Sequence, residues 1–285
     1  MSVKITPLSP SIGAKVTGVR LVGGLDEQSF AAIREAFDTY SMLVIPGQPM
    51  NDDDQVEFSK RFGTLEISVA VNPGRGTPFA RQSNLDIKTG EMIPPDDRRM
   101  FYQKANMLWH ADSTFKDTLS LCSILTARKV PPEGGATEFV STRTVYEGLS
   151  ATAKAEVEDL VVEHSFIHSR GLVGFTFTPE EAAHYPAVRH RLVQVNAANG
   201  RRSLLIGVHA SHIVGWPLAK GRDLLADLMA RATRPENVLR HEWTEGDVVI
   251  WDNRAALHRA TPYDTTRHVR LMQRTTISTG VPSQL

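Results

Sequence analysis

The chain has 285 residues, of which 41% are hydrophobic and 22% are charged, a composition typical of globular proteins. Lys and Arg together number 32, as do Asp and Glu, so no overall charge attracts nucleic acid or an anionic membrane surface, and we expect neither as a partner. A single large domain covering residues 1–285 is the simplest organisation for a chain of this length.

The first predicted elements are two amphipathic helices on either side of a short strand. Residues 29–40 place apolar side chains at helical spacing after an acidic start, and residues 51–62 repeat the pattern with an Asn cap and a closing glycine. Residues 42–45 form an apolar run between them that favours a strand. The N-terminal part is therefore expected to place helices beside a sheet.

Residues 68–104 form a polar segment rich in Pro, Gly, Arg and Asp, and they show no sustained periodicity. A segment of this length is unusual as a connector inside a compact domain. We therefore predict that it is a lid over an active site.

The remainder of the chain is rich in short β-type segments with turn residues between them. The predicted strands are residues 120–127, 137–140, 160–166, 192–195, 203–208, 247–251 and 269–277. The predicted helices among them are residues 150–160, 178–181 and 218–232. This pattern predicts a mainly β fold with flanking helices and a jelly-roll core.

Three residues form a candidate metal site. His110 and Asp112 make the only His-x-Asp sequence in the chain, and on a strand such a pair points to one face. His258, just beyond the apolar strand 247–251, is the best candidate for a third ligand. Two imidazoles and one carboxylate are the ligand set of non-haem Fe(II) oxygenases, whereas zinc more often takes three His or Cys. We also expect Asp252 and Asn253 to brace the turn before His258 and to accept its second ring proton.

Several motifs in the same order resemble the taurine dioxygenase and 2,4-dichlorophenoxyacetate dioxygenase family of Fe(II)- and 2-oxoglutarate-dependent oxygenases. The similarity extends over nearly the whole chain and is closer to the phenoxyacetate branch. The matching segments are residues 13–19, 44–48, 58–65, 109–115, 131–139, 251–258 and 270–276. The resemblance implies a double-stranded β-helix, an Fe(II) ion, 2-oxoglutarate as cosubstrate and dioxygen.

The resemblance also implies roles for residues beyond the metal ligands. Thr137 and Arg270 should hold the distal carboxylate of 2-oxoglutarate, which chemically requires a fixed cation and a hydroxyl donor. Arg274, four residues beyond Arg270 and so on the same strand face, should bind the anion of the substrate. His209 and His212 are candidates for the substrate pocket, although ordinary surface positions suit them equally well. Arg270 follows His258 by one residue more than the family spacing, which predicts an insertion in the loop 261–267.

The resemblance implies hydroxylation of a small anionic molecule, with succinate and CO₂ as coproducts. An aryloxyacetate or related carboxylate is our first hypothesis, which would place the enzyme in aromatic compound catabolism. Hydroxylation beside the ether oxygen would give a hemiacetal that collapses to a phenol and a 2-oxo acid. Ile67, Val69 and Val71 could supply one apolar wall for the aryl group. Taurine or another alkyl sulfonate is the alternative substrate.

Two other functional classes fit the sequence less well. A non-catalytic metal-binding or sensor protein on the same fold would keep His110, Asp112 and His258 but would not need both Thr137 and Arg270. A hydrolase would need motifs such as His-Glu-x-x-His or Gly-x-Ser-x-Gly, which the sequence lacks. An oxygenase is therefore the better interpretation.

Cellular location is indicated by the N-terminus and the cysteine content. The first residues lack a signal-peptide pattern, and no stretch approaches the ~18 apolar residues of a membrane span. Cys122, the one cysteine, can form no internal disulfide, which suits a reducing compartment. We expect a cytoplasmic protein, and we expect it to form a homo-oligomer.

Overall fold

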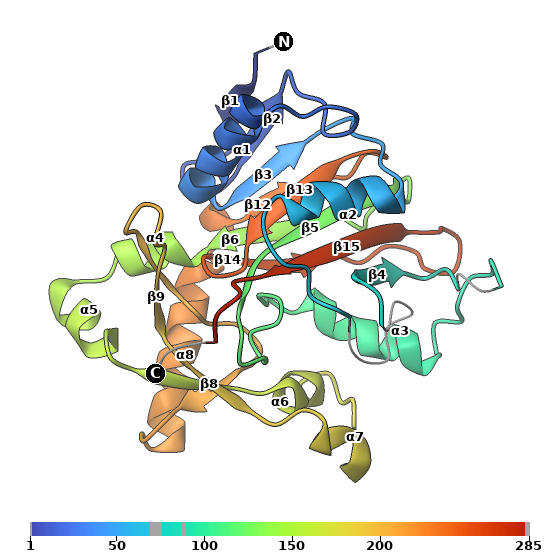
Figure 1. Cartoon of the computed structure of the whole chain (residues 1–285). Helices are drawn as coiled ribbons and strands as arrows, with labels where there is room; N and C mark the ends of the chain where they lie inside the picture. Colours follow the sequence, from blue (N-terminus) through green and yellow to red (C-terminus); the bar gives the residue numbers. More distant parts are fainter. Residues whose placement is uncertain (1, 69–75, 87–88, 283–285) are drawn as a thin grey trace.

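The structure is a computed structural model that describes residues 2–68, 76–86 and 89–282 (Figure 1). In this part of the chain, seven strands form the largest sheet in the order β1-β2-β3-β13-β5-β15-β4. All neighbours in it are antiparallel except β2 and β3. The bounds in spatial order are β1 Lys4–Pro7, β2 Ala14–Thr17, β3 Met42–Ile45, β13 Val248–Asp252, β5 Ser120–Lys129, β15 Leu271–Ser278 and β4 Phe79–Ser83.

A second, three-stranded sheet packs against the large one. Its order is β12 (Leu239–His241), β6 (Thr137–Ser141) and β14 (Ala256–Ala260). Apolar side chains of both sheets form one buried cluster, with Leu125 and Trp251 from the large sheet and Phe139 from the small one. Two largely antiparallel sheets facing each other across an apolar layer are the core of a jelly roll, which confirms the predicted fold class.

Helices α1 (Glu27–Tyr40) and α2 (Asp52–Lys60) cover the outer face of the large sheet. The side chain of Asp26 accepts a hydrogen bond from the backbone N–H of Ser29 and caps α1. Asn51 and Asp54 form a reciprocal capping box at the start of α2. These local signals explain why both helices were predicted within a few residues of their observed bounds.

A third layer lies on the other side of the second sheet, where α8 packs against α4 and β11 (Figure 1). It contains the sheet β11-β7-β8 and the pair β10-β9. Its strands are β7 Val161–His164, β8 Val188–Arg191, β9 Val193–Val195, β10 Arg202–Leu204 and β11 Ala210–Ile213. Its helices are α4 Thr142–Glu147, α5 Ala151–Val157, α6 Phe166–Gly171, α7 Pro179–Ala183, α8 Leu218–Ala232 and the 3₁₀ turn η2 Pro235–Asn237.

Some predicted bounds in this layer were wrong. The strand expected over residues 203–208 ends at Leu204, before Gly207, whose φ of 120° departs from the extended conformation. The strand expected over residues 160–166 ends at His164, because the side chain of Ser165 accepts a hydrogen bond from His168 N–H and starts helix α6. Capping by Ser165 competes with strand continuation, and the apolar pattern alone did not reveal it.

The segment predicted as a lid, residues 68–104, is described only in part, since residues 69–75 and 87–88 lie outside the described residues. Its described part includes the edge strand β4, which pairs with β15, and the helix α3 (Arg98–Gln103). A 3₁₀ turn, η1 (Lys104–Met107), connects α3 to the His-x-Asp motif. In the described part of the chain, no helix is both long and apolar enough to cross a membrane.

Candidate metal centre

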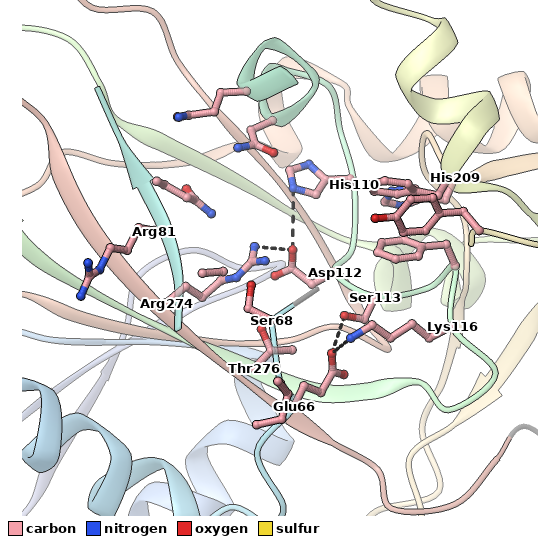
Figure 2. Close-up of a pocket in the computed structure, with 18 of the residues that line it drawn as sticks. Glu66, Ser68, Arg81, His110, Asp112, Ser113, Lys116, His209, Arg274 and Thr276 are labelled. Atoms are coloured by element: carbon pink, nitrogen blue, oxygen red, sulfur yellow. Dashed lines mark hydrogen bonds and ion pairs between the residues drawn. The ribbon is translucent and has the colours of Figure 1, made fainter. Parts of the chain in front are cut away.

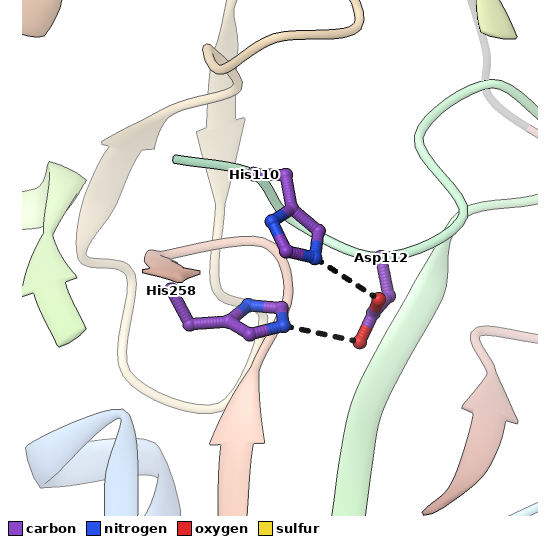
Figure 3. Close-up of side chains that lie close together, drawn as sticks. All are labelled: His110, Asp112 and His258. Carbon is purple, nitrogen blue, oxygen red and sulfur yellow. Dashed lines mark ion pairs between the residues drawn. The ribbon is translucent and has the colours of Figure 1, made fainter. Parts of the chain in front are cut away.

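His258 lies next to His110 and Asp112, although it is far from both of them in the chain (Figure 3). His110 pairs with His258 of β14 as an antiparallel bridge, with reciprocal N–H to carbonyl distances of 3.0 and 2.9 Å. Their ring centroids are 4.1 Å apart, and Asp112 lies in the turn that follows. One ligand atom from each residue lies within 4.8 Å of the other two. This spacing allows all three to reach one metal ion.

The three side chains are buried, and burial together with neighbouring charges sets their protonation states. Burial lowers the pKa of His110 and lowers that of His258 well below its ordinary value, so both imidazoles are neutral at pH 7. Burial acts to raise the pKa of Asp112, but the Arg274 guanidinium and the two imidazoles outweigh it and leave the pKa below its usual range. Neutral imidazoles and an ionised carboxylate are the forms that bind a divalent metal.

Hydrogen bonds around the imidazoles favour a metal-binding orientation. The ring Nδ1 of His110 lies 2.7 Å from the carbonyl oxygen of Leu108. A carbonyl can only accept, so Nδ1 carries the proton and the lone pair of Nε2 faces Asp112. Neither ring nitrogen of His258 has a hydrogen-bond partner among the described residues. A buried imidazole without a partner fits a donor set completed by a metal ion.

Asp112 is braced by a network of neighbouring side chains. Its Oδ2 accepts a hydrogen bond of 2.7 Å from Ser123, and its backbone N–H donates to Asn253 Oδ1 at 3.0 Å. Asn253 in turn donates to Ser123 at 3.0 Å. The expectation that Asp252 and Asn253 accept the second ring proton of His258 was wrong, because Asn253 braces Asp112 and Asp252 accepts from Arg254 at 2.8 Å.

Thr137 is the first residue of β6, and Arg270, directly before β15, contacts the segment that leads into β6. The side chain of Arg270 is buried, and its Nε donates to the carbonyl of Gly135 at 3.1 Å. Gly135 has a φ of 69°, and a Cβ there would lie 3.2 Å from Arg270 Cδ, so this close approach suits glycine. Thr137 Oγ1 accepts from Trp243 Nε1 at 3.0 Å. Because that bond occupies a lone pair, the hydroxyl proton of Thr137 can be donated to a carboxylate.

The electrostatic surroundings of Arg270 are unusual for a buried cation. Burial lowers its pKa to about 10, and no carboxylate of the described residues forms an ion pair with it. Its Nη2 has no hydrogen-bond partner in the described part of the chain. An uncompensated buried guanidinium is costly unless an anion joins it. A carboxylate beside Arg270 would compensate this buried charge.

A cavity opens beside His110 and Asp112, with an arginine on one side and an aromatic cluster on the other, and the charged Glu66 and Lys116 also line it (Figure 2). Arg274 lines it, and its Nη1 contacts Asp112 Oδ1. His209 lines the opposite side, with Nδ1 3.2 Å from Thr114 Oγ1 and with burial lowering its pKa well below the ordinary value. The aromatic residues on that side are Phe115, Phe166 and Tyr185. The cavity can therefore hold an anion at one end and an apolar ring at the other.

The structure does not bring every predicted site residue to this cavity. His212 lies on β11, where its Nδ1 is 2.9 Å from Ser211 Oγ and 3.9 Å from Glu163, and it is not among the lining residues. Ile67 lines the cavity as predicted, whereas Val69 and Val71 lie outside the described residues. Phe166 and Tyr185 were missed by the sequence analysis, because they lie in segments that show no site motif.

Comparison with known proteins finds similar sequences and a similar structure over nearly the whole chain. The profile of the family described as "Taurine catabolism dioxygenase TauD, TfdA family" matches residues 4–276. An alpha-ketoglutarate-dependent 2,4-dichlorophenoxyacetate dioxygenase from Cupriavidus pinatubonensis is 39% identical, over 99% of this chain and 100% of its own. An (S)-phenoxypropionate/alpha-ketoglutarate-dioxygenase from Sphingobium herbicidovorans is 35% identical, over 92% and 91% respectively. The crystal structure of AAD-2 in complex with Mn(II) and N-oxalylglycine superposes with a TM-score of 0.92 at 36% identity, covering 100% of both chains.

Proposed function

Because the chain belongs to the taurine catabolism dioxygenase TauD, TfdA family, we propose that it hydroxylates a small aryl-substituted carboxylate, with an aryloxyacetate as the first candidate. The chain is an enzyme, an iron- and 2-oxoglutarate-dependent dioxygenase. It is therefore not a non-catalytic metal-binding or sensor protein.

We assign the iron to His110, Asp112 and His258. The assignment is supported by their convergence, by the neutral state of the imidazoles, and by the ring nitrogens of His258, which have no hydrogen-bond partner among the described residues. When bound, the iron supplies the activation of dioxygen and the oxidation of substrate, while 2-oxoglutarate is converted to succinate and CO₂. Ser123 and Asn253 hold the Asp112 carboxylate and its backbone in place.

We assign the distal carboxylate of 2-oxoglutarate to Arg270 and Thr137. The guanidinium provides a fixed cation in a buried setting, and the hydroxyl proton of Thr137 is left available by its bond from Trp243. N-oxalylglycine, the ligand in the AAD-2 crystal structure, differs from 2-oxoglutarate only in carrying an N–H in place of one CH₂ group. The same carboxylate contacts would therefore serve either molecule.

The substrate proposal rests on the two-sided cavity. Arg274 is placed to hold a carboxylate next to the metal centre, and Phe115, Phe166 and His209 form a wall against which an aromatic ring can pack. A substrate held in this way would present the carbon between its carboxylate and its ether oxygen to the metal centre. Hydroxylation of that carbon in an aryloxyacetate gives a hemiacetal, which breaks down to a phenol and glyoxylate.

An alkyl sulfonate such as taurine is the second candidate. Its sulfonate would also suit Arg274, but it has no ring to use the aromatic wall. A succinate-release screen over aryloxyacetates, aryl carboxylates and sulfonates separates the two. We expect a phenol and succinate in equal amounts from an aryloxyacetate. Turnover of taurine without turnover of any aryl substrate would overturn the proposal.

The role of Arg274 has its own test. We expect Arg274→Ala to impair product formation far more than the slow succinate release that occurs without substrate, because the arginine holds substrate and not cosubstrate. If both activities fell together, Arg274 would act only through its contact with Asp112.

The metal assignment is tested by alanine variants. We expect His110→Ala and His258→Ala to lose iron binding and activity while remaining folded, since these side chains serve the metal. His184→Ala, at an exposed histidine outside the cavity, is the matched control. Unchanged iron affinity in either ligand variant would contradict the assignment.

Two further predictions concern the protein in the cell. We propose a cytoplasmic location, supported by the single buried and unpaired Cys122. We also propose that the protein forms a homo-oligomer, which light scattering on the purified chain tests directly. A monomer at micromolar concentration would contradict the second prediction.

A further inference from the structure

The residue after the proposed ligand Asp112 has a strained backbone. Ser113 has a φ of 58°, in the left-handed region, which is unfavourable for residues other than glycine. Such a conformation persists only where the surrounding structure enforces it. Because Ser113 follows Asp112 directly, its backbone conformation determines the direction in which the chain leaves the metal centre.

Glu66 holds the side chain of Ser113. Its Oε2 accepts a hydrogen bond of 2.7 Å from Ser113 Oγ, and the same oxygen contacts Lys116 Nζ (Figure 2). The backbone N–H of Lys116 also donates to the carbonyl of Ser113 at 3.0 Å, which closes the turn. The Glu66 side chain is 10% exposed, so these contacts are shielded from water.

Glu66 is itself fixed to the large sheet. Its backbone N–H donates to the carbonyl of Thr276 on β15 at 2.8 Å. The neighbouring Leu65 pairs with Ile277 as an antiparallel bridge. The strand that carries Arg274 is therefore also the strand that anchors Glu66, so the carboxylate of Glu66 is presented to the turn from a rigid support.

We propose that Glu66 is a positioning residue that stabilises the left-handed backbone of Ser113 and thereby orients the Asp112 carboxylate for metal binding. The inference depends on the proposed metal centre. Glu66 is not among the three side chains whose ligand atoms converge, so its effect would pass through Ser113. Its other oxygen, Oε1, accepts no hydrogen bond from the described residues, which makes direct contact with substrate the rival role.

Substitutions of Ser113 test the mechanism without altering Glu66. Ser113→Ala loses the hydrogen bond but keeps the unfavourable left-handed conformation, whereas Ser113→Gly loses the same bond and tolerates that conformation. We expect Ser113→Ala to weaken Mn(II) binding about tenfold. Ser113→Gly should weaken it less. Mn(II) affinity is measured from the paramagnetic resonance signal of the free ion, which does not depend on turnover.

Glu66 variants provide the second test. We expect Glu66→Ala to weaken Mn(II) binding about tenfold and Glu66→Gln to weaken it less, because the amide oxygen can still accept from Ser113. In the Ser113→Gly background, Glu66→Ala should have little additional effect. Glu147→Ala, which removes an exposed partner of Arg201, is the control.

The results distinguish an error in the metal centre from an error in the role of Glu66. If the wild-type chain binds no Mn(II), or if His258→Ala binds it equally well, the metal centre itself is wrong. If the metal centre holds but Ser113→Gly is worse than Ser113→Ala, the turn needs rigidity and not left-handed geometry, and the role of Glu66 is refuted. A raised KM for substrate with unchanged Mn(II) affinity in Glu66→Ala would establish the rival role. Should Glu66→Ala fail to fold, the two Ser113 variants still test whether the left-handed backbone of residue 113 supports Mn(II) binding.

Discussion

Replacing Arg270 by methionine should stabilise the ligand-free protein while removing cosubstrate binding. Burial lowers the pKa of Arg270 from 12.5 to about 10, and a fall of this size corresponds to about 3 kcal/mol of lost solvation. The cost is uncompensated, because Arg270 forms no ion pair with a described acid. Methionine fills a similar volume without a charge. We therefore expect Arg270→Met to raise the free energy of unfolding of the ligand-free protein by about 1–3 kcal/mol.

The same variant should bind 2-oxoglutarate poorly. Removing one partner of a buried charge pair costs about 3–5 kcal/mol, so its dissociation constant should rise by about a hundredfold to a few thousandfold. Denaturant unfolding with and without Mn(II) and 2-oxoglutarate measures both effects. In the wild type the ligands should raise the unfolding midpoint, and in Arg270→Met 2-oxoglutarate should add nothing to the effect of Mn(II).

Arg254 provides a matched control, because its replacement should change the free energy of unfolding in the opposite direction. It is also largely buried, but it donates to the fully buried Asp252 at 2.8 Å. Arg254→Met leaves that carboxylate without its partner and should lower the free energy of unfolding by about 3–5 kcal/mol. If Arg270→Met also destabilised the ligand-free protein, the reasoning about an uncompensated cation would be refuted.

Three further predictions follow from the same structure. Thr137→Ala should weaken 2-oxoglutarate binding by about 1–3 kcal/mol, less than loss of Arg270, and an unchanged dissociation constant in a binding titration would exclude the hydroxyl from the site. Burial and His190 lower the pKa of His164 from 6.5 to about 3, so the unfolded chain binds the proton more readily. The contribution of His164 to the free energy of unfolding should be fully present above pH 6.5 and should fall by about 1.4 kcal/mol per pH unit toward pH 3. Urea unfolding of His164→Leu should therefore show a flatter dependence of this free energy on pH than the wild type. Equal slopes in the two proteins would contradict the prediction. If residues 68–104 act as a lid, amide exchange in the described part of that segment should slow when cosubstrate and substrate are both bound, and indifference to ligands would refute the lid.

Local signals in the sequence were enough to predict the fold class and most elements. Helices α1 and α2 begin at side-chain caps that involve residues three positions apart, and such contacts can be read directly from the sequence. The His110-x-Asp112 motif was equally visible, because both residues lie within one short segment. Strand β13 was found because it is buried on both faces and almost continuously apolar, and β5 because single Ser and Thr residues are all that interrupt its apolar residues between Leu121 and Ala127.

The partners of these elements could only be determined from the tertiary structure. Sheet register places Trp251 opposite Ser123, and this pairing brings Asn253 and Ser123 to Asp112, whereas sequence proximity had suggested that Asn253 serves His258. Spacing along one strand fixes which side chains share a face, but contacts between strands depend on packing of the whole core.

In the substrate cavity, too, some features could be predicted from the sequence and others depend on the tertiary structure. Arg274 was predicted to point inward from its spacing to Arg270 along one strand, but its contact with Asp112 depends on how the 112–115 turn folds against β15. Phe166 and Tyr185 reach the cavity from helix α6 and from the segment after α7, where no periodic pattern indicates a site. Residues from separate elements converge because burial of the apolar layers fixes the elements relative to one another, and that long-range constraint leaves no local trace in the sequence.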